Sequence, residues 1–313
     1  MSNLKSKPPC GQATGYDYVA DTEGFRYAVS ELTGEVVPSV TLEVPAGTTM
    51  QTPDEQQRRR EQDEKRKILD ARKNVSDSLG GFYFVLSGEQ FKEISPASVA
   101  RLIYLNTYAR YEDNQLMLTE RTSMKSADLI DVLSLSKAQT YRFRDEVQGR
   151  YLYENDSGLY FTDWNVFKRG KLRVQNSGSW YQKIYVENVR KLYHATDGKN
   201  HKHLGYLFQM LPFVNVEFNM LCHNPTETDL DAVEPMTLLQ FCEAIGYDFK
   251  NVKRLLWIYK ELTFDVHGRQ ERFCSIIGNG LDLGASIIYV NPNIIYSGTN
   301  FDRVQVLGKF CAV

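Results

Sequence analysis

The chain is 313 residues long, 42% hydrophobic and 24% charged, which is typical of a globular protein with two or three domains. No apolar run approaches the roughly 20 residues that span a bilayer, and the N-terminus lacks the apolar segment of a secretory signal, so we expect a cytoplasmic protein without a membrane partner. The net charge of −2 argues mildly against a nucleic-acid partner, and five scattered cysteines argue against a disulfide framework.

Residues 1–80 predict an N-terminal extension made of a β-hairpin and a charged helix. Residues 25–37 alternate apolar and polar side chains around a central Thr-Gly pair, which is typical of a hairpin. Residues 53–76 contain eight basic and six acidic residues with almost no apolar face, and Pro53 suits the first turn of a helix. We interpret this helix as a solvated linker, with a DNA-contacting arm as the alternative.

Two segments of similar plan follow, residues 81–180 and residues 201–313, joined by a connecting helix within residues 181–200. Each is expected to hold a helix–turn–helix followed by a β-hairpin, so we predict a mainly helical α+β fold with two winged-helix domains. The first segment should contain a strand, a helix, the helix–turn–helix and the hairpin, at residues 81–91, 96–111, 125–147 and 150–163. The second should contain an apolar helix interrupted at Pro212, two more helices and two strands, at residues 201–222, 237–246, 248–262, 271–277 and 286–291.

An internal repeat is the most informative feature of the chain. Eight residues of the first helix–turn–helix recur 112 positions later without a gap: Met124, Leu129, Val132, Leu133, Ser136, Gln139, Arg142 and Phe143 match Met236, Phe241, Ala244, Ile245, Asp248, Asn251, Arg254 and Leu255. A similar ending follows each block, at residues 161–170 and 289–298, with an offset of 128. The repeat predicts two similarly built modules, each presenting a basic helix.

The second helix of the first module is the candidate for entering a DNA major groove. Ser136 can cap it, and its outward residues are expected to be Lys137, Gln139, Thr140, Arg142 and Arg144. Arginine pairs with guanine through two hydrogen bonds, glutamine pairs with adenine, and lysine contacts phosphate. After the predicted hairpin, four cations are expected to hold phosphates: Lys168, Arg169, Lys171 and Arg173.

The corresponding helix of the second module is the weaker DNA candidate. Its exposed residues are expected to be Lys250, Asn251, Lys253 and Arg254. Asp248 should cap this helix, and its carboxylate would repel a phosphate docked there. The second hairpin lacks a basic cluster, and we interpret residues 278–284 as its flexible tip. Residues 137–203 contain thirteen Lys and Arg against seven Asp and Glu, which leaves the rest of the chain at −8.

From about Gly81 onward, the chain resembles winged-helix proteins encoded by phages and mobile elements of Gram-positive bacteria. The segment LIDVLSLSKAQTYRFRDEV at 129–147, with the hairpin and FKRGKL at 167–172, is similar to the helix–turn–helix and wing of RepL-type plasmid replication proteins. Those proteins follow the wing with an Asn and an Arg-Gly pair, matched by Asn165, Arg169 and Gly170. The resemblance implies a winged-helix fold and DNA binding in the bacterial cytoplasm, in association with the nucleoid. Residues 1–80 have no counterpart in RepL-type proteins, which leaves a dimerising or partner-binding role open.

We therefore expect a non-enzymatic, sequence-specific binder of double-stranded DNA that regulates transcription or initiates replication of a mobile element. The alternative is an interaction protein that binds host transcription or replication machinery through its winged helices, and a homodimer is a further option. No cofactor is expected, because the phosphate-loop pattern GxxxxGK[ST] is absent. No metal site is expected either, because His201, His203, Cys222 and His223 lack the spacing of zinc ligands.

Overall fold

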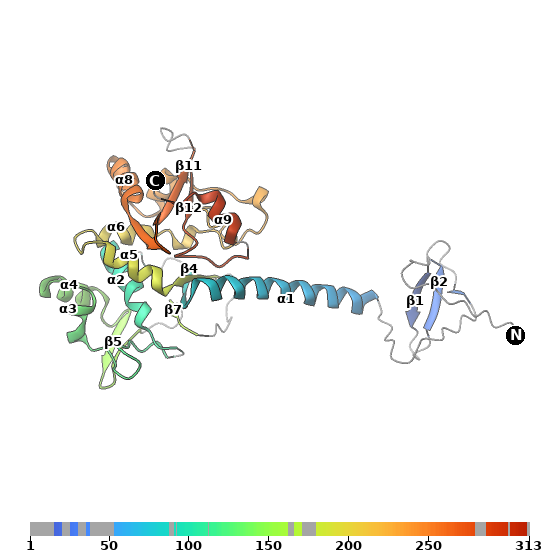
Figure 1. Ribbon diagram of the computed structural model, residues 1–313, viewed down its shortest axis with the longest axis horizontal. Helices are drawn as coiled ribbons and strands as arrows, with labels where there is room; N and C mark the ends of the chain where they lie inside the picture. Colours follow the sequence, from blue (N-terminus) through green and yellow to red (C-terminus); the bar gives the residue numbers. More distant parts are fainter. Residues whose placement is uncertain are drawn as a thin grey trace. The chain divides into compact units, whose positions relative to one another are not determined.

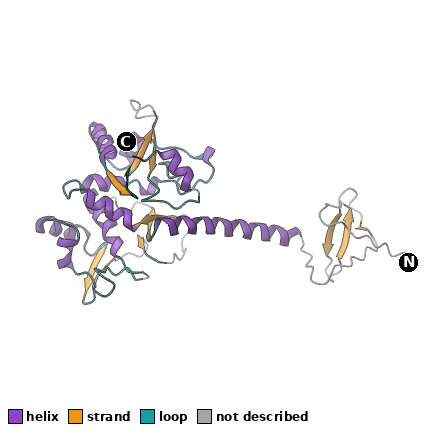
Figure 2. Ribbon diagram, viewed as in Figure 1, coloured by secondary structure: helices purple, strands orange, loops and turns teal. Residues whose placement is uncertain are grey.

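Helices and short antiparallel strands alternate along the chain in the computed structural model, giving a mixed α and β fold with small hairpins (Figures 1 and 2). The structure describes residues 16–20, 26–30, 36–37, 53–87, 91, 93–111, 113–161, 166–170, 180–278, 286–299 and 301–311. Contacts divide the chain into two compact units, residues 1–69 and residues 70–313. Among the described residues, no helix is both long enough and apolar enough to cross a bilayer.

The first unit contains a small antiparallel sheet with the strand order β1 (Tyr16–Ala20), β2 (Arg26–Ser30), β3 (Val36–Val37). The pairing of β2 with β3 confirms the predicted hairpin, whose Thr-Gly turn lies outside the described residues. Strand β1, which pairs with β2, is not indicated by the sequence pattern.

Helix α1 (Pro53–Leu79) confirms the predicted charged helix. Its side chains from residue 54 to residue 70 are exposed, as expected for a helix without an apolar face. Near its end, Val75 and Leu79 pack on a small apolar cluster that includes Tyr185 and Tyr296. This packing anchors the last turns of α1 within the second unit.

At the centre of the second unit lies an antiparallel sheet with the strand order β7 (Phe167–Lys168), β4 (Phe82–Ser87), β8 (Trp180–Tyr185). Strand β4 lies within the predicted strand, whereas β8 corrects the expectation of a helix from residue 183 onward. Gln182 and Ile184 are buried, while the residues between and before them are half-buried, which is the period-two burial of a strand. The connecting helix α5 (Val186–Ala195) begins only after this strand.

Helices α2 (Pro96–Leu105) and α6 (His201–Phe208) cross at short range. The Ser95 hydroxyl caps α2 by accepting a hydrogen bond from the Ser98 amide, which matches the predicted helix start. Gly205 permits the crossing, because a Cβ built on it would lie 1.6 Å from the Pro96 carbonyl oxygen. The helix predicted over residues 201–222 is wrong beyond Phe208: the chain leaves the helix before Pro212, whose ring disfavours a helical residue ahead of it.

Each predicted module contains two helical segments joined by a tight turn and followed by hairpins. In the first, these are η2 (Ser126–Asp128), α3 (Leu129–Val132), α4 (Lys137–Val147), β5 (Leu152–Asn155) and β6 (Gly158–Phe161). In the second, they are α7 (Leu238–Ala244), η5 (Phe249–Asn251), α8 (Val252–Glu261), β9 (Thr263–Val266), β10 (Arg269–Arg272), β11 (Cys274–Ile277) and β12 (Ile287–Val290), followed by α9 (Phe301–Gly308).

The hairpin of β9 and β10 is an addition that the sequence interpretation misses. Its turn lies at His267 and Gly268, which have φ angles of 51° and 80°. Two consecutive positive φ angles are the geometry of the tight turns that join twisted strands. The next two strands, β11 and β12, confirm the strands predicted near 271–277 and 286–291. Residues 279–285, which include nearly all of the predicted hairpin tip, lie outside the described residues.

The predicted repeat extends to the backbone hydrogen bonds. With the offset of 112, the first helical segment of each module begins with the same hydrogen bond: the Asp128 carboxylate accepts from the Lys125 amide, and the Gln240 side-chain oxygen accepts from the Thr237 amide. Before these helical segments, equivalent elements of the two modules lie 105 residues apart. Helices α2 and α6 are one such pair. The others are the turns η1 (Asn106–Tyr108) and η3 (Leu211–Phe213) and the bridges Ala109–Leu116 and Val214–Leu221. The intervening loop is therefore seven residues longer in the second module (112 against 105), and it contains η4 (Leu230–Ala232).

Strands β4 and β8 pair with equivalent segments of the two modules. Val85 of β4 pairs with Phe167, and Ile184 of β8 pairs with Ile295 in the equivalent way. Strands β4 and β8 also pair with each other in antiparallel register, with Val85 opposite Gln182 and Tyr83 opposite Ile184. Both modules contribute to one hydrophobic core. The boundaries at residues 81–180 and 201–313 stay a prediction, because a shared core does not mark where a duplicated module ends.

Candidate nucleic-acid interface

The turn between α3 and α4 fixes the direction of α4. Ser134 has a φ of 52°, and the Leu135 amide donates to the Ile130 carbonyl at 3.1 Å. Ser136 then caps α4 as predicted: the Gln139 amide donates to its hydroxyl, while the Gln139 side-chain oxygen accepts from the Ser136 amide at 3.2 Å. The side-chain oxygen of Gln139 is thus engaged in a capping box.

Helix α4 buries one face and exposes the other. Phe143 and Val147 are fully buried, whereas Lys137, Tyr141 and Arg142 are exposed. Thr140 does not project outward as expected: it is 3% exposed, and its hydroxyl donates to the Ser136 carbonyl at 3.1 Å. Position 140 lies three residues before Phe143 and seven before Val147, so helical periodicity places it on the buried face.

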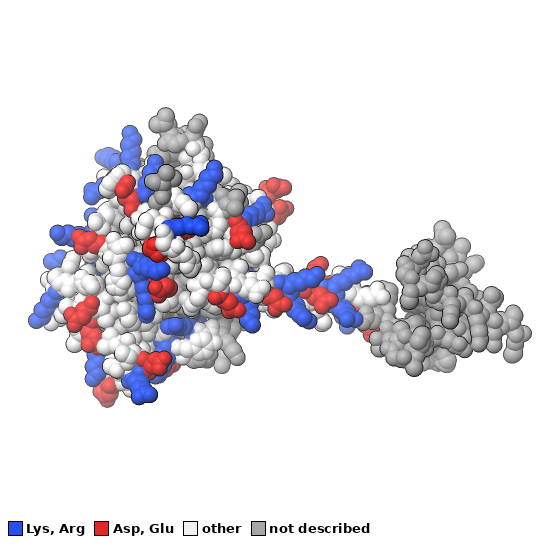
Figure 3. Space-filling view, in the orientation of Figure 1, with Lys and Arg blue, Asp and Glu red and all other residues white. Residues whose placement is uncertain are grey.

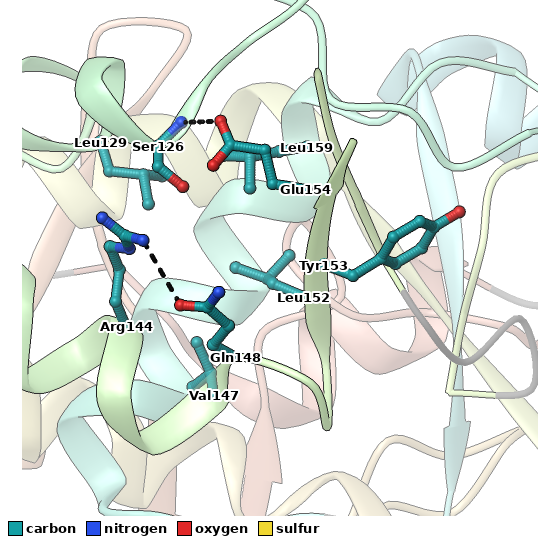
Figure 4. Close-up of a pocket in the computed structure, with 9 residues that line it drawn as sticks. All are labelled: Ser126, Leu129, Arg144, Val147, Gln148, Leu152, Tyr153, Glu154 and Leu159. Carbon is teal, nitrogen blue, oxygen red and sulfur yellow. Dashed lines mark hydrogen bonds between the residues drawn. The ribbon is translucent and has the colours of Figure 1, made fainter. Parts of the chain in front are cut away.

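Arg144 lies half-buried in a pocket between α4 and the hairpin of β5 and β6 (Figure 4). Its Nη2 donates to the Gln148 side-chain oxygen at 3.4 Å, so one end of the guanidinium is directed toward the end of α4. Glu154 of β5 lines the same pocket and accepts a hydrogen bond from the Ser126 amide at 2.8 Å. Hydrogen bonds from Ser126 hold the pKa of Glu154 below its ordinary value, and the nearby charge of Arg144 acts in the same direction. The carboxylate ties the hairpin to the start of the helical pair.

The hairpin itself is held closely against the module. A Cβ at Gly158, whose φ is 126°, would lie 2.8 Å from the Met124 carbonyl oxygen, so only glycine fits there. On the paired strands, the rings of Tyr153 and Tyr160 stack with centroids 5.2 Å apart. The tip residues 155–157 are exposed.

Of the four cations predicted to hold phosphates, two can be located. Lys168 is half-buried in β7. Arg169 is turned inward: its Nη1 donates to the Ala109 carbonyl at 2.8 Å, and burial lowers the pKa of the guanidinium. Arg169 therefore has a structural role through Nη1, and its contact with a phosphate stays a prediction. Lys171 and Arg173 lie outside the described residues.

In the second module, the predicted residues Lys250, Asn251, Lys253 and Arg254 are all exposed. Asp248 caps the helical segment as expected, and its carboxylate accepts from the Lys250 amide at 3.0 Å and from the Asn251 side chain at 3.2 Å. Sequence reasoning misses two exposed aromatic side chains here, Phe249 and Trp257. The signal for them is the helical period, since Val252, Leu255 and Tyr259 occupy the buried face.

The residues considered for metal binding have other surroundings. His201 is buried, with Nε2 3.2 Å from the Thr196 carbonyl oxygen and its ring centroid 4.2 Å from that of Tyr193. In the described part of the chain, no group of three His, Cys, Asp or Glu side chains is arranged to hold a metal ion.

Comparison of the chain with models of protein families, with curated proteins and with solved structures finds no match. The candidate interface therefore rests on the geometry of the two modules.

Proposed function

We propose that the chain binds double-stranded DNA in a sequence-specific manner through two winged-helix modules, and that it regulates transcription or initiates replication of a mobile element. Helix α4 enters the major groove, and the hairpin of β5 and β6 lies beside it as the wing. In such proteins, the second helix of the helix–turn–helix contacts base edges with its N-terminal residues. Lys137 and Arg142, in the first two turns of α4, are the exposed cations at that position.

The observation that supports this proposal best is an arginine repeated between the modules. Arg142 and Arg254 lie 112 residues apart, each six positions after the helix cap, and both are exposed. Neither side chain is needed for packing, because Phe143 and Leu255 next to them supply the buried contact. An exposed arginine at this position suits paired hydrogen bonds to guanine. In Figure 1, α4 lies at the lower left of the second unit and α8 at its upper left.

The test is selection of bound fragments from the host or element genome, followed by fluorescence anisotropy on the selected duplex. Arg142→Ala should weaken binding by about 1–3 kcal/mol and relax the preference at one base pair. Lys199→Ala, which removes an exposed cation from a loop before α6, is the matched control and should leave affinity unchanged. The affinity should also fall steeply as salt rises, because phosphate contacts release counterions.

Two results would reject the proposal. Absence of any selected duplex, together with capture of a purified host transcription or replication protein, would establish the interaction-protein alternative instead. Selected duplexes that Arg142→Ala binds with unchanged affinity and site choice would show that α4 is not the reading helix.

A further inference from the structure

Two large aromatic side chains of the second module lie in solvent. Trp257 of α8 is 61% exposed and Phe249 of η5 is 53% exposed. Tryptophan and phenylalanine normally bury most of their area, and that burial is favourable. Exposed rings at both ends of one short helical stretch therefore call for a partner surface.

The repeat provides an internal control for what the fold requires at these positions. With the offset of 112, Phe249 corresponds to Lys137 and Trp257 corresponds to Asp145 of α4, and both of these charged residues are exposed. The same backbone therefore forms with charged side chains at the two positions. Packing does not explain the aromatic rings, and they distinguish the second module from the first.

The aromatic rings share their helix face with cations. Lys250, Lys253 and Arg254 are exposed and lie between the two rings in sequence; we call these five residues, from Phe249 to Trp257, the α8 surface. Figure 3 shows Lys and Arg side chains gathered at the upper left, where α8 lies in Figure 1. The nearest carboxylate in sequence, that of Asp248, is occupied by the helix cap. The charge of the α8 surface is therefore complementary to an anionic partner.

We propose that the α8 surface binds single-stranded nucleic acid. In a duplex, bases are stacked and paired, so the faces of their rings are hidden and the grooves offer only edges. Unpaired bases expose those faces, and aromatic side chains beside a cationic track bind them by stacking while the cations contact the phosphates. The two rings are eight positions apart, which is roughly 12 Å along a helix, so they can stack on different bases of one strand.

The inference refines the proposed function: α4 remains the helix that contacts paired DNA, whereas α8, the weaker duplex candidate, contacts an unpaired strand. In this arrangement Arg254 contacts a phosphate of that strand rather than a paired guanine. It rests on the proposed function only for the choice of DNA rather than RNA as the single strand. The two can fail separately, because Arg142→Ala tests α4 on duplex and Trp257→Ala tests α8 on single strands.

The experiment measures anisotropy of a labelled oligothymidine of about 20 nucleotides, longer than the site of one small binding fold, with the full chain. Trp257→Ala should weaken binding about 5- to 150-fold, the range for loss of one stacked base. Trp257→Phe keeps an aromatic face and should restore most of the affinity. Tyr141→Ala removes an exposed ring from α4 and is the matched control, expected to bind the oligothymidine as the wild type does.

Three outcomes would overturn the proposal. One is an oligothymidine that the wild type does not bind, and another is Trp257→Ala binding it with unchanged affinity. The third is an equal loss of affinity for duplex and single strand in Trp257→Ala, which would place α8 in the duplex interface. Binding of an acidic peptide at the α8 surface with no single-strand affinity would assign the surface to a protein partner.

Discussion

Ser134 and Gly246 hold the same left-handed backbone in two turns that lie 112 residues apart, with φ angles of 52° and 68°. The Ser134 amide donates to the Asp131 carbonyl at 3.1 Å, and the Gly246 amide donates to the Glu243 carbonyl at the same distance. A side chain with a Cβ costs roughly 1–2 kcal/mol in this region of φ and ψ, whereas glycine adopts it freely. The first module therefore contains a local strain that the second module avoids.

Exchanging these residues should move stability in opposite directions. Gly246→Ala should lower the free energy of unfolding by about 1 kcal/mol, because no atom lies within 4 Å of a Cβ at this position and only the backbone preference changes. Ser134→Gly should raise it by up to about 1 kcal/mol. Urea denaturation measures both. A Gly246→Ala protein as stable as the wild type would show that the turn relaxes to another conformation.

The crossing of α2 and α6 should tolerate no side chain at position 205. Gly205→Ala places a Cβ 1.6 Å from the Pro96 carbonyl oxygen, so the helices must separate. We expect a loss of about 3 kcal/mol in the free energy of unfolding, the upper range for overpacking. Gly246→Ala serves as the control for an added methyl group in open space. An equal effect of the two substitutions would mean that α2 and α6 can move apart at little cost.

The elements that local chemistry specifies could be predicted from the sequence. Ser136 and Asp248 cap their helices as expected, and the repeated apolar positions, such as Phe143 and Leu255, are buried in both modules. Caps and helical periodicity depend on residues within a turn or two, so a single sequence is sufficient to find them. The same holds for the charged helix α1, whose composition leaves it without an apolar face.

Features that depend on distant parts of the chain were beyond the sequence. Arg169 follows a basic pattern typical of phosphate binding, but its partners are the carbonyls of Thr107 and Ala109, some 60 residues away. Strand β8 pairs with β4, which lies nearly 100 residues earlier in the chain. This pairing makes residues 183–185 a strand, although the sequence pattern predicts a helix there. The exposure of Trp257 differs from these two cases, because the helical period of the buried residues Val252, Leu255 and Tyr259 already indicates it.

Burial of His201 should make the protein less stable in mild acid. Desolvation, assisted by the positive charge of Arg101, lowers the pKa of His201 to about 4, whereas an unfolded histidine has a pKa of about 6.5. Between these values, the unfolded state binds more protons, so the free energy of unfolding falls as pH decreases from about 6.5 to about 4. The full contribution, on the order of 3 kcal/mol, is present above that window.

His201→Gln removes this titration and should flatten the dependence of stability on pH between about 6.5 and 4. The measurement is urea denaturation of both proteins at several pH values, and the difference in slope isolates His201 from the carboxyl groups. Parallel curves for the two proteins would show that His201 is accessible to protons in the folded state.

Removing the charge of Glu154 should strengthen binding of duplex DNA. Its carboxylate lies beside Arg144 on the helix–hairpin side of the first module, where a phosphate backbone would pass in the proposed complex. A unit charge about 10 Å from a phosphate in water opposes binding by about 0.4 kcal/mol, so Glu154→Gln should bind duplex about twofold more tightly at low salt. The gain should shrink as salt screens the repulsion. The pKa of Glu154 is held low, so the wild type keeps this charge near neutral pH.

Glu234→Gln, a substitution in the loop before α7, is the control. Weaker binding by Glu154→Gln would instead show that the tie between Glu154 and Ser126 positions the wing and outweighs the repulsion.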